Sequence, residues 1–201
     1  MFTGIITDIG KVKTVSKDAD GKTITIETGL DLSKTAIGAS ISCSGACMTV
    51  IEKNASSFTV NVSGESLSKT TIGEWLAGRE INLEPALKVG DELGGHLVSG
   101  HVDGLGSVAM IEPVGESLKI DIKVEPDLGR FIAPKGSVSI DGVSLTVNTV
   151  KTDKNSHIFS LNIIPHTAIE TTLGKLCVGD KVNVEIDTLA RYVARLLDSQ
   201  T

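Results

Sequence analysis

The sequence predicts an all-β protein made of two tandem, six-stranded antiparallel barrels followed by a C-terminal helix. Three observations support this. Short segments rich in Val, Ile and Thr alternate apolar and polar residues, glycine-bearing turns separate them, and the second half of the chain repeats the first. Alternation with period two is typical of half-buried antiparallel strands. It is clearest in 22–28, 57–62, 117–124 and 181–186.

The repeat appears when the sequence is aligned with itself after a shift of 96 to 101 residues. At 97 residues, GACMTV (45–50) falls on GVSLTV (142–147), with Cys47 in the first copy where the second has Ser144. At 101 residues, eight identical positions of 58–84 recur in 159–185, and the first glycines match at 96. The blocks keep their order, so we infer a tandem duplication with a few loop insertions.

Each half holds about 90 residues and about six strands, which favours a small closed barrel because closure removes exposed strand edges. We expect a first barrel over residues 1–90 and a second over 95–187, joined by the polar, glycine-bearing connection 88–95. The remaining residues, 188–201, are expected to form a helix.

A short helix is also expected between strands of each half, at 65–73 and 166–174. Each should end on a glycine in the left-handed conformation, Gly73 or Gly174. On the C-terminal helix, apolar residues share one face: Leu189, Val193, Leu196 and Leu197. Either the helix docks on its own barrel, or this face contacts another subunit. The sequence leaves both open.

Composition narrows the function. The chain is 40% hydrophobic without an apolar run of the ~18 residues that a membrane span needs, and its start lacks the features of a secretory signal. Three cysteines outside any framework favour free thiols in a reducing compartment, so we expect a cytoplasmic protein. A net charge of −6 and 3% aromatic residues argue against nucleic-acid binding.

A duplicated barrel implies two equivalent pockets, so positions where the copies differ are informative. The differences put polar residues in the second half: Ile5 matches His101, Ile37 matches Lys135, Cys47 matches Ser144 and Ala86 matches Asp187, while Thr49 matches Thr146. We expect the polar set to converge in the second barrel, where it would exchange protons, while the first barrel only holds a ligand.

Alternatives stand beside this interpretation. A lone cysteine is usually a small buried hydrophobe, and Asp187 is suited to cap the helix that follows it. His96 and His101 should lie on opposite faces of a strand, so no shared metal is expected. Motifs for metal-dependent, redox or nucleotide-phosphate chemistry are also absent from the sequence.

Several blocks together resemble the riboflavin synthase family, and the match runs from Met1 to the C-terminal helix. They are MFTGII, GACMTV, GGHLVSGHVDG (94–104), KGSVSIDGVSLTV (135–147), IIPHTAIETTLG (163–174) and VNVEID (182–187). The resemblance implies Greek-key barrels in a homotrimer, with sites between neighbouring chains and no cofactor or metal. It implies conversion of two molecules of 6,7-dimethyl-8-ribityllumazine into riboflavin and 5-amino-6-ribitylaminouracil, and raises lumazine synthase as a partner.

The resemblance also places the substrate contacts. These are Phe2, Gly4, Ile5, Ile6, Ser40, Cys47, Met48, Thr49, Asn61, Val62, Ser63, Gly64, Glu65 and Ser66 in the first half, and Gly100, His101, Val102, Lys135, Ser144, Leu145, Thr146, Ile164, Pro165, His166, Thr167, Ala168 and Ile169 in the second. As catalytic residues we expect Ser144 and Thr146 with His101 nearby to relay protons, Asp187 to support them, and Cys47 to act as a nucleophile or as a packing group.

Two other functions are weighed against the enzyme. A lumazine-binding antenna protein of the same superfamily would bind one pigment without turnover, but such relatives typically lose the polar set that this chain keeps. A two-barrel interaction module would explain the fold but not the chemical difference between the copies.

Overall fold

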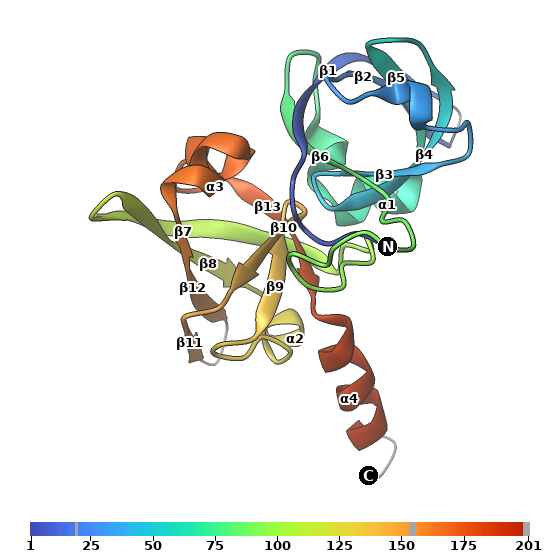
Figure 1. The fold of residues 1–201 in the computed structure, drawn as a ribbon. Coiled ribbons are helices and arrows are strands. Elements are labelled where there is room, and N and C mark those ends of the chain that lie inside the picture. Colours follow the sequence, from blue (N-terminus) through green and yellow to red (C-terminus); the bar gives the residue numbers. More distant parts are fainter. Residues whose placement is uncertain (19, 153–155, 199–201) are drawn as a thin grey trace.

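The computed structural model describes residues 1–18, 20–152 and 156–198. Its strands form a closed barrel and, beside it, a curled seven-stranded sheet that corresponds to the predicted second barrel and keeps that name here (Figure 1). The first barrel is closed in the order β1-β2-β5-β4-β3-β6 and antiparallel throughout, as predicted. Its strands are β1 (Asp8–Lys17), β2 (Gly21–Glu27), β3 (Ser40–Cys43), β4 (Ala46–Lys53), β5 (Ser57–Ser63) and β6 (Glu80–Pro85).

The second barrel is a curled sheet in the order β10-β9-β13-β7-β8-β12-β11. Its two end strands are consecutive pieces that only Val147 and Asn148 separate, and together they match the single strand β4 of the first barrel. The sheet therefore begins and ends with the halves of one interrupted strand. Its strands are β7 (Gly104–Val114), β8 (Ser117–Val124), β9 (Ser137–Ile140), β10 (Val143–Thr146), β11 (Thr149–Thr152), β12 (His157–Ile163) and β13 (Lys181–Ile186).

Short helices lie at equivalent places in the two barrels: α1 (Gly64–Lys69) with the 3-10 turn η2 (Thr71–Glu74), and α3 (Pro165–Glu170) with η3 (Thr172–Lys175). Two others, η1 (Leu32–Lys34) and α2 (Pro126–Gly129), lie between β2 and β3 and between β8 and β9, so they also occupy equivalent places although they differ in helix type. The expectation of left-handed glycines was wrong, since neither Gly73 nor Gly174 has a positive φ. Glycine is needed there for close approach, because an added Cβ would lie 2.5 or 2.2 Å from the carbonyl oxygen of Leu67 or Ala168.

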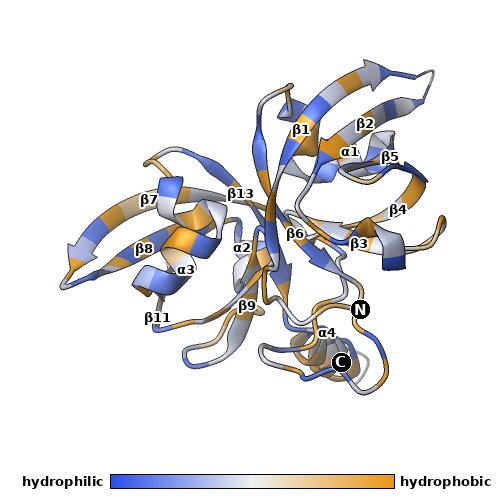
Figure 2. Cartoon of the chain, turned by 45° about the horizontal axis from the view of Figure 1, so that its top comes forward, coloured by the Kyte–Doolittle hydropathy of each residue, from blue (hydrophilic) through white to orange (hydrophobic). Residues whose placement is uncertain are grey.

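Each barrel encloses its own hydrophobic core, and the strands alternate hydrophobic and hydrophilic residues along their length (Figure 2). The segments that open the two halves do not stay with their own barrels, however. Ile6 packs against the core of the second barrel, and Val102 packs against the core of the first. The two halves therefore exchange the segments that precede β1 and β7.

An approximate two-fold axis relates the barrels, because equivalent residues meet each other at the junction. Phe2 and Val98 exchange backbone hydrogen bonds of 2.7 and 3.0 Å. Gly45 and Gly142 touch so closely that a Cβ on Gly45 would lie 2.8 Å from the nitrogen of Gly142. The repeated glycines at the start of GACMTV and GVSLTV are therefore the contact point of the two copies.

Two asparagines form hydrogen bonds across the junction between the barrels. The Asn82 side chain donates to the carbonyl oxygen of Asp141 at 2.9 Å and accepts from the backbone N–H of Thr172 at 2.8 Å. Asn183 makes the mirrored bonds, both of 2.7 Å, to Ser44 and Thr71. Both asparagines are almost fully buried. Buried backbone groups of each barrel thus depend on a side chain of the other.

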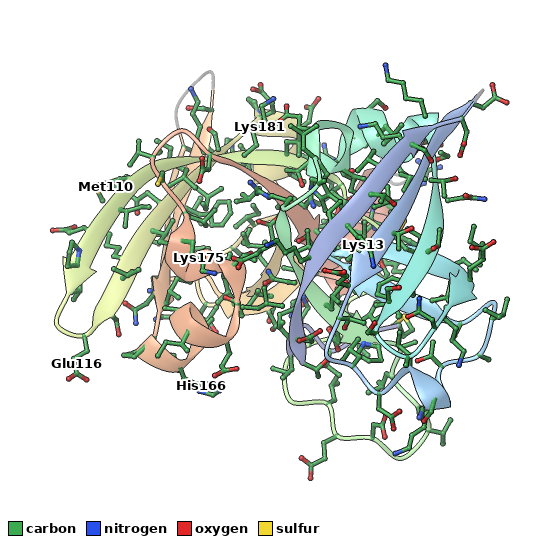
Figure 3. All side chains as sticks on the ribbon, turned by 90° about the horizontal axis from the view of Figure 1, so that it is seen from above. Lys13, Met110, Glu116, His166, Lys175 and Lys181 are labelled. Carbon is green, nitrogen blue, oxygen red and sulfur yellow. The ribbon has the colours of Figure 1, made fainter. Side chains whose placement is uncertain are left out.

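The junction also shows a charge reversal between the copies. Glu74 pairs with Lys181 and Glu80 pairs with Lys175, and at an offset of 101 residues Glu74 matches Lys175 while Glu80 matches Lys181. Both lysines lie toward the junction between the barrels (Figure 3). Like copies would place equal charges opposite each other, so these pairs favour docking of a first half on a second half.

The last element, α4 (Thr188–Asp198), extends away from both barrels (Figure 1). The expected residues 199–201 of this helix lie outside the described part of the chain. Its base is held by an ion pair of 2.7 Å between Arg191 and Asp103, whereas Leu189, Val193 and Leu197 are exposed. Among the described residues, none of the helices has the length and hydrophobicity to cross a membrane.

Asp141 makes the stability of the junction depend on pH. Burial raises its pKa from 3.8 to about 7, although the backbone N–H of Asn183 donates to the carboxylate at 2.8 Å. Since the folded pKa lies above the unfolded value, the folded state favours the protonated acid, and stability is lost as pH rises from about 4 to 7.

We expect Asp141→Asn, which keeps the acceptor oxygen, to have the same free energy of unfolding as wild type at pH 4. At pH 8 its free energy of unfolding should be higher than that of wild type by roughly 2 to 4 kcal/mol. Urea unfolding at both pH values measures this, with exposed Asp127→Asn as control; equal gains at both pH values would contradict it.

Candidate active site

The first pocket is a cavity of about 260 Å³ at the edge of the first barrel. Residues from both halves line it: Ala46, Cys47, Met48, Glu65, Ser66, Lys69, Thr70, Gly100, His101 and Val102. Cys47 and Met48 come from β4, and Glu65 to Lys69 come from α1, which follows β5 directly. His101 reaches this cavity because the segment before β7 crosses to the first barrel.

Gly100 holds the crossing segment against β4. Its carbonyl oxygen accepts the backbone N–H of Cys47 at 2.8 Å, and its φ of +81° suits glycine. A Cβ at this position would lie 2.6 Å from the Cβ of Cys47. Only glycine lets the backbone approach the cysteine so closely, which places His101 beside Cys47.

The second site repeats this arrangement with different side chains. Gly4, with φ of +76°, accepts the backbone N–H of Ser144 at 2.8 Å, and a Cβ on it would lie 2.6 Å from the Cβ of Ser144. Ile5 follows it, as His101 follows Gly100. Thr146 ends the same strand, β10, and is exposed. The Ser144 site therefore combines β10 with the first residues of the chain.

The structure does not bring the expected polar set together. We expected His101 to join Ser144 in the second barrel, but His101 shares a cavity with Cys47. The comparison of copies assumed that each half's first segment belongs to its own barrel. Because these segments cross, Ile5 serves the Ser144 site and His101 serves the Cys47 site.

His96 replaces His101 as the histidine of the second site. Its Nδ1 lies 2.7 Å from the Oγ of Ser144, and its backbone N–H donates to Thr3 at 3.1 Å. Burial lowers the pKa of His96, while the nearby Asp187 and Glu185 carboxylates act in the opposite direction. The imidazole is thus neutral at neutral pH and able to accept a proton from the serine hydroxyl.

The other ring nitrogen of His96, Nε2, is buried and has no hydrogen-bond partner within the described residues. An unpaired buried polar atom is costly and is often kept where a ligand or water completes the site. Sequence comparison of the copies missed His96 because it lies before the first matched pair, Gly4 with Gly100. Its only signal was its place in GGHLVSGH, between the two glycines and the crossing segment.

Asp187 caps the C-terminal helix, which is one of the two interpretations of its sequence position, while its support of the catalytic residues stays a prediction. Its Oδ1 accepts the backbone N–H of Leu189 at 2.9 Å, which caps the start of α4. Its charge also acts on His96. One carboxylate thus links the second site to the base of the C-terminal helix.

Lys135 has a strained backbone, with φ of +67°. Its backbone N–H donates to Val147 at 2.7 Å, as that of Gly38 donates to Val50 at 2.8 Å, so its counterpart is Gly38 and the expected match with Ile37 was wrong. In the first barrel this left-handed position is a glycine, also with positive φ. A lysine retained where glycine is favoured is typical of a functional side chain.

The remaining predicted contacts divide by exposure. Phe2 and Val62 are buried. The Phe2 ring packs against Gly100, so it supports the backbone that lines the first pocket and offers no accessible surface to a ligand. Ser40 pairs with Thr49 across β3 and β4. The stretches 61–66 and 164–169 are mostly accessible, and His166 lies at the outer side of α3 (Figure 3). In the part of the chain that the structure describes, no group of three His, Cys, Asp or Glu residues is arranged to hold a metal ion.

Fold and sites together define a tandem-barrel, ligand-binding protein with two related but chemically different sites. The family model described as "Lumazine binding domain" matches residues 3–86 and again residues 99–187.

Relatives extend the match over the whole chain. The riboflavin synthase of Brucella abortus (strain 2308) is 49% identical, and the alignment covers 100% of both chains. That of Photobacterium phosphoreum is 42% identical over 98% of this chain and 89% of the relative, and that of Bacillus subtilis (strain 168) is 36% identical over 98% and 90%. The chain therefore belongs to the riboflavin synthase family of lumazine-binding proteins and is an enzyme of riboflavin biosynthesis.

Solved structures agree with the fold. LumP complexed with riboflavin matches with a TM-score of 0.83 and 28% identity, covering 92% of this chain and 99% of LumP. LumP complexed with 6,7-dimethyl-8-(1'-D-ribityl) lumazine matches over the same shares with a TM-score of 0.80 and 27% identity.

Lys135→Gly tests whether the strained lysine serves the site. Replacing a lysine whose backbone has a positive φ should leave the free energy of unfolding unchanged or raise it by up to about 1 kcal/mol, with a melting temperature that is unchanged or higher. It should weaken lumazine binding, because the side-chain charge is lost. Calorimetry and fluorescence titration measure the two effects, and Gly38→Lys in the first barrel is the reciprocal control. Lower stability with unchanged binding would contradict this interpretation.

Proposed function

We propose that the protein converts two molecules of 6,7-dimethyl-8-ribityllumazine into riboflavin and 5-amino-6-ribitylaminouracil. One observation supports this most: two equivalent sites share one scaffold yet carry different reactive groups, Cys47 with His101 in one and Ser144 with His96 in the other. Identical substrates need similar pockets. Different products require that the pockets act differently, because one lumazine gives up a four-carbon unit and the other receives it.

The reaction begins with loss of a proton from the 7-methyl group of one lumazine. The resulting carbanion delocalises into the electron-poor ring, so a positioned base is sufficient. In this proposal Ser144 contacts the ligand: its Oγ takes the methyl proton as its own hydroxyl proton passes to the Nδ1 of His96, 2.7 Å away. Asp187 and Glu185 favour the protonated form of His96 and so hold the proton once it arrives.

The first pocket supplies a different environment. Cys47 is partly accessible there beside His101, with Lys69 and Glu65 on the neighbouring helix α1. Such polar groups suit a ligand's ribityl chain and ring carbonyls.

Positioning is the largest contribution that the protein makes. Holding two rings face to face turns a bimolecular encounter into a nearly unimolecular one, worth ~7 to 11 kcal/mol at best. We take the rim of the second site to be Ile5, which follows Gly4, together with Ile164 and Ile169 at α3, the helix equivalent to α1. These three apolar residues are 47%, 51% and 72% exposed. We propose that the first barrel of a neighbouring chain covers this rim, in a homotrimer joined through α4.

The proposal also includes a cellular compartment and a protein partner. Cys43, Cys47 and Cys177 are free thiols, which suits the cytoplasm. Lumazine synthase, which would supply the substrate, is the partner to test, by co-sedimentation of the two pure proteins.

Incubation of the pure protein with 6,7-dimethyl-8-ribityllumazine, without additives, tests the reaction. We expect riboflavin to appear in the visible absorbance and an equal amount of 5-amino-6-ribitylaminouracil by chromatography. A lumazine that binds but is not converted would favour the antenna alternative. No spectral change would exclude both.

Ser144 and His96 should act as one unit. We expect Ser144→Ala and His96→Gln each to lower kcat by roughly 100-fold with a small change in KM, because general base catalysis contributes about that much. The double variant should be no worse than either single variant. Steady-state kinetics measure this, with His157→Gln as a distant control; additive losses would contradict the dyad.

The trimer proposal depends on the exposed face of α4. Val193→Glu should prevent assembly, because a charge there opposes burial of the face, and it should abolish turnover while each chain still binds lumazine. Sedimentation velocity and the riboflavin assay measure both, with Arg195→Glu on the same helix as control. A monomeric wild type that retains full activity would contradict the proposal.

A further inference from the structure

Two buried glutamates occupy equivalent positions in the two barrels. Glu84 on β6 is 4% exposed and Glu185 on β13 is 2% exposed, and they match at an offset of 101 residues. Burying a carboxylate is costly unless hydrogen bonds replace its water. The groups that donate hydrogen bonds to these two carboxylates indicate their role.

Glu84 binds the turn that precedes Ile5. It accepts the backbone N–H of Thr3 at 2.6 Å, the hydroxyl of Thr3 at 2.8 Å and the backbone N–H of Gly4 at 2.9 Å. The same threonine hydroxyl accepts the backbone N–H of Ile5 at 3.1 Å. The carboxylate therefore fixes both the left-handed glycine and the direction in which Ile5 leaves it.

Glu185 binds the equivalent turn in the same way. It accepts the backbone N–H and the hydroxyl of Ser99, both at 2.6 Å, and the backbone N–H of Gly100 at 2.9 Å. The serine hydroxyl accepts the backbone N–H of His101 at 3.3 Å. Thr3 and Ser99 thus play the same part, although their side chains differ.

The glycine of each turn then contacts the reactive residue of the opposite barrel. Gly4, held by Glu84 of the first barrel, bonds Ser144 of the second, and Gly100, held by Glu185 of the second barrel, bonds Cys47 of the first. Each connection passes from carboxylate to turn to reactive residue through hydrogen bonds of 2.6 to 2.9 Å.

We propose that Glu84 and Glu185 are positioning residues that act crosswise, each setting the reactive residue of the other barrel's site. The proposal rests on the proposed function for the reaction that these sites perform, but the geometry does not depend on it. A carboxylate suits the task because its two oxygens accept from two neighbouring N–H groups and a hydroxyl. Glutamine has one such oxygen, so Glu→Gln removes part of the grip at nearly constant volume.

The thiol of Cys47 gives a readout that needs no turnover. In a Cys177→Ser background, Cys47 is the accessible cysteine, since Cys43 is buried and burial raises the pKa of its thiol far above the ordinary value. We expect Glu185→Gln to change the rate of Cys47 alkylation by iodoacetamide by roughly threefold or more, because exposure and local field set thiol reactivity. Glu84→Gln should leave that rate unchanged, although Glu84 and Cys47 share a barrel.

Ser99→Ala separates positioning from charge, and it also replaces Glu185→Gln should that variant fail to fold. It removes only the hydroxyl link, keeps the carboxylate, and should shift Cys47 reactivity in the same direction, with Thr3→Val as its matched control. A shift caused by Glu84→Gln and not by Glu185→Gln, or equal shifts from both, would overturn the proposal.

Turnover provides the second readout. Glu84→Gln should lower kcat more than it raises KM, because it acts on Ser144, while leaving Cys47 alkylation at the wild-type rate. Loss of both properties in Glu84→Gln would mean general damage and would overturn crosswise positioning. Glu185→Gln is judged by alkylation alone, because the Glu185 carboxylate also acts on His96 at the second site. If wild type forms no riboflavin, the proposed function fails, while the alkylation rates still decide this proposal.

Discussion

Asn82 and Asn183 each extend a carboxamide across the junction of the two barrels, where it bonds a buried carbonyl and a buried N–H of the opposite barrel. Leaving such groups unpaired costs about 1 to 3 kcal/mol each, so the barrels are held at a fixed distance and angle. That fixed junction allows Gly45 to touch Gly142 and allows the first segment of each half to cross. Both sites depend on it.

The crossing explains how one scaffold carries two chemistries. Each site combines a strand from one half with a turn from the other, so a change in either half alters both the local pocket and its distant partner. The first site has a thiol beside an exposed imidazole, and the second has a hydroxyl beside a partly buried one. The partly buried imidazole of His96 has a lowered pKa and is acted on by two carboxylates, which suits a base.

Sequence reasoning predicted the strands and helices because these follow from local patterns of two to four residues, and it predicted the repeat because the two halves share residues at offsets of 96 to 101. It could not predict the crossing of Ile6 and Val102, since no local pattern records which core a segment joins. His101 was consequently assigned to the second barrel, and His96 was passed over because its role appears only when Ser144 is brought beside it. The offset of Lys135 was wrong by one residue, because backbone φ decides the match with Gly38. The repeated Asn82/Asn183 and Glu84/Glu185 were visible in the alignment of the copies, but their meaning required the junction.

Native-state hydrogen exchange of the backbone amides of Cys47 and Ser144 tests the central claim most directly, since each amide bonds a glycine of the other half. If the sites depend on the docked junction, both amides should exchange together, with the same free energy of opening as the N–H groups of Thr71 and Thr172 that the two asparagines bind. Exchange of Cys47 with the core amides of the first barrel and of Ser144 with those of the second, at two independent rates, would contradict the account.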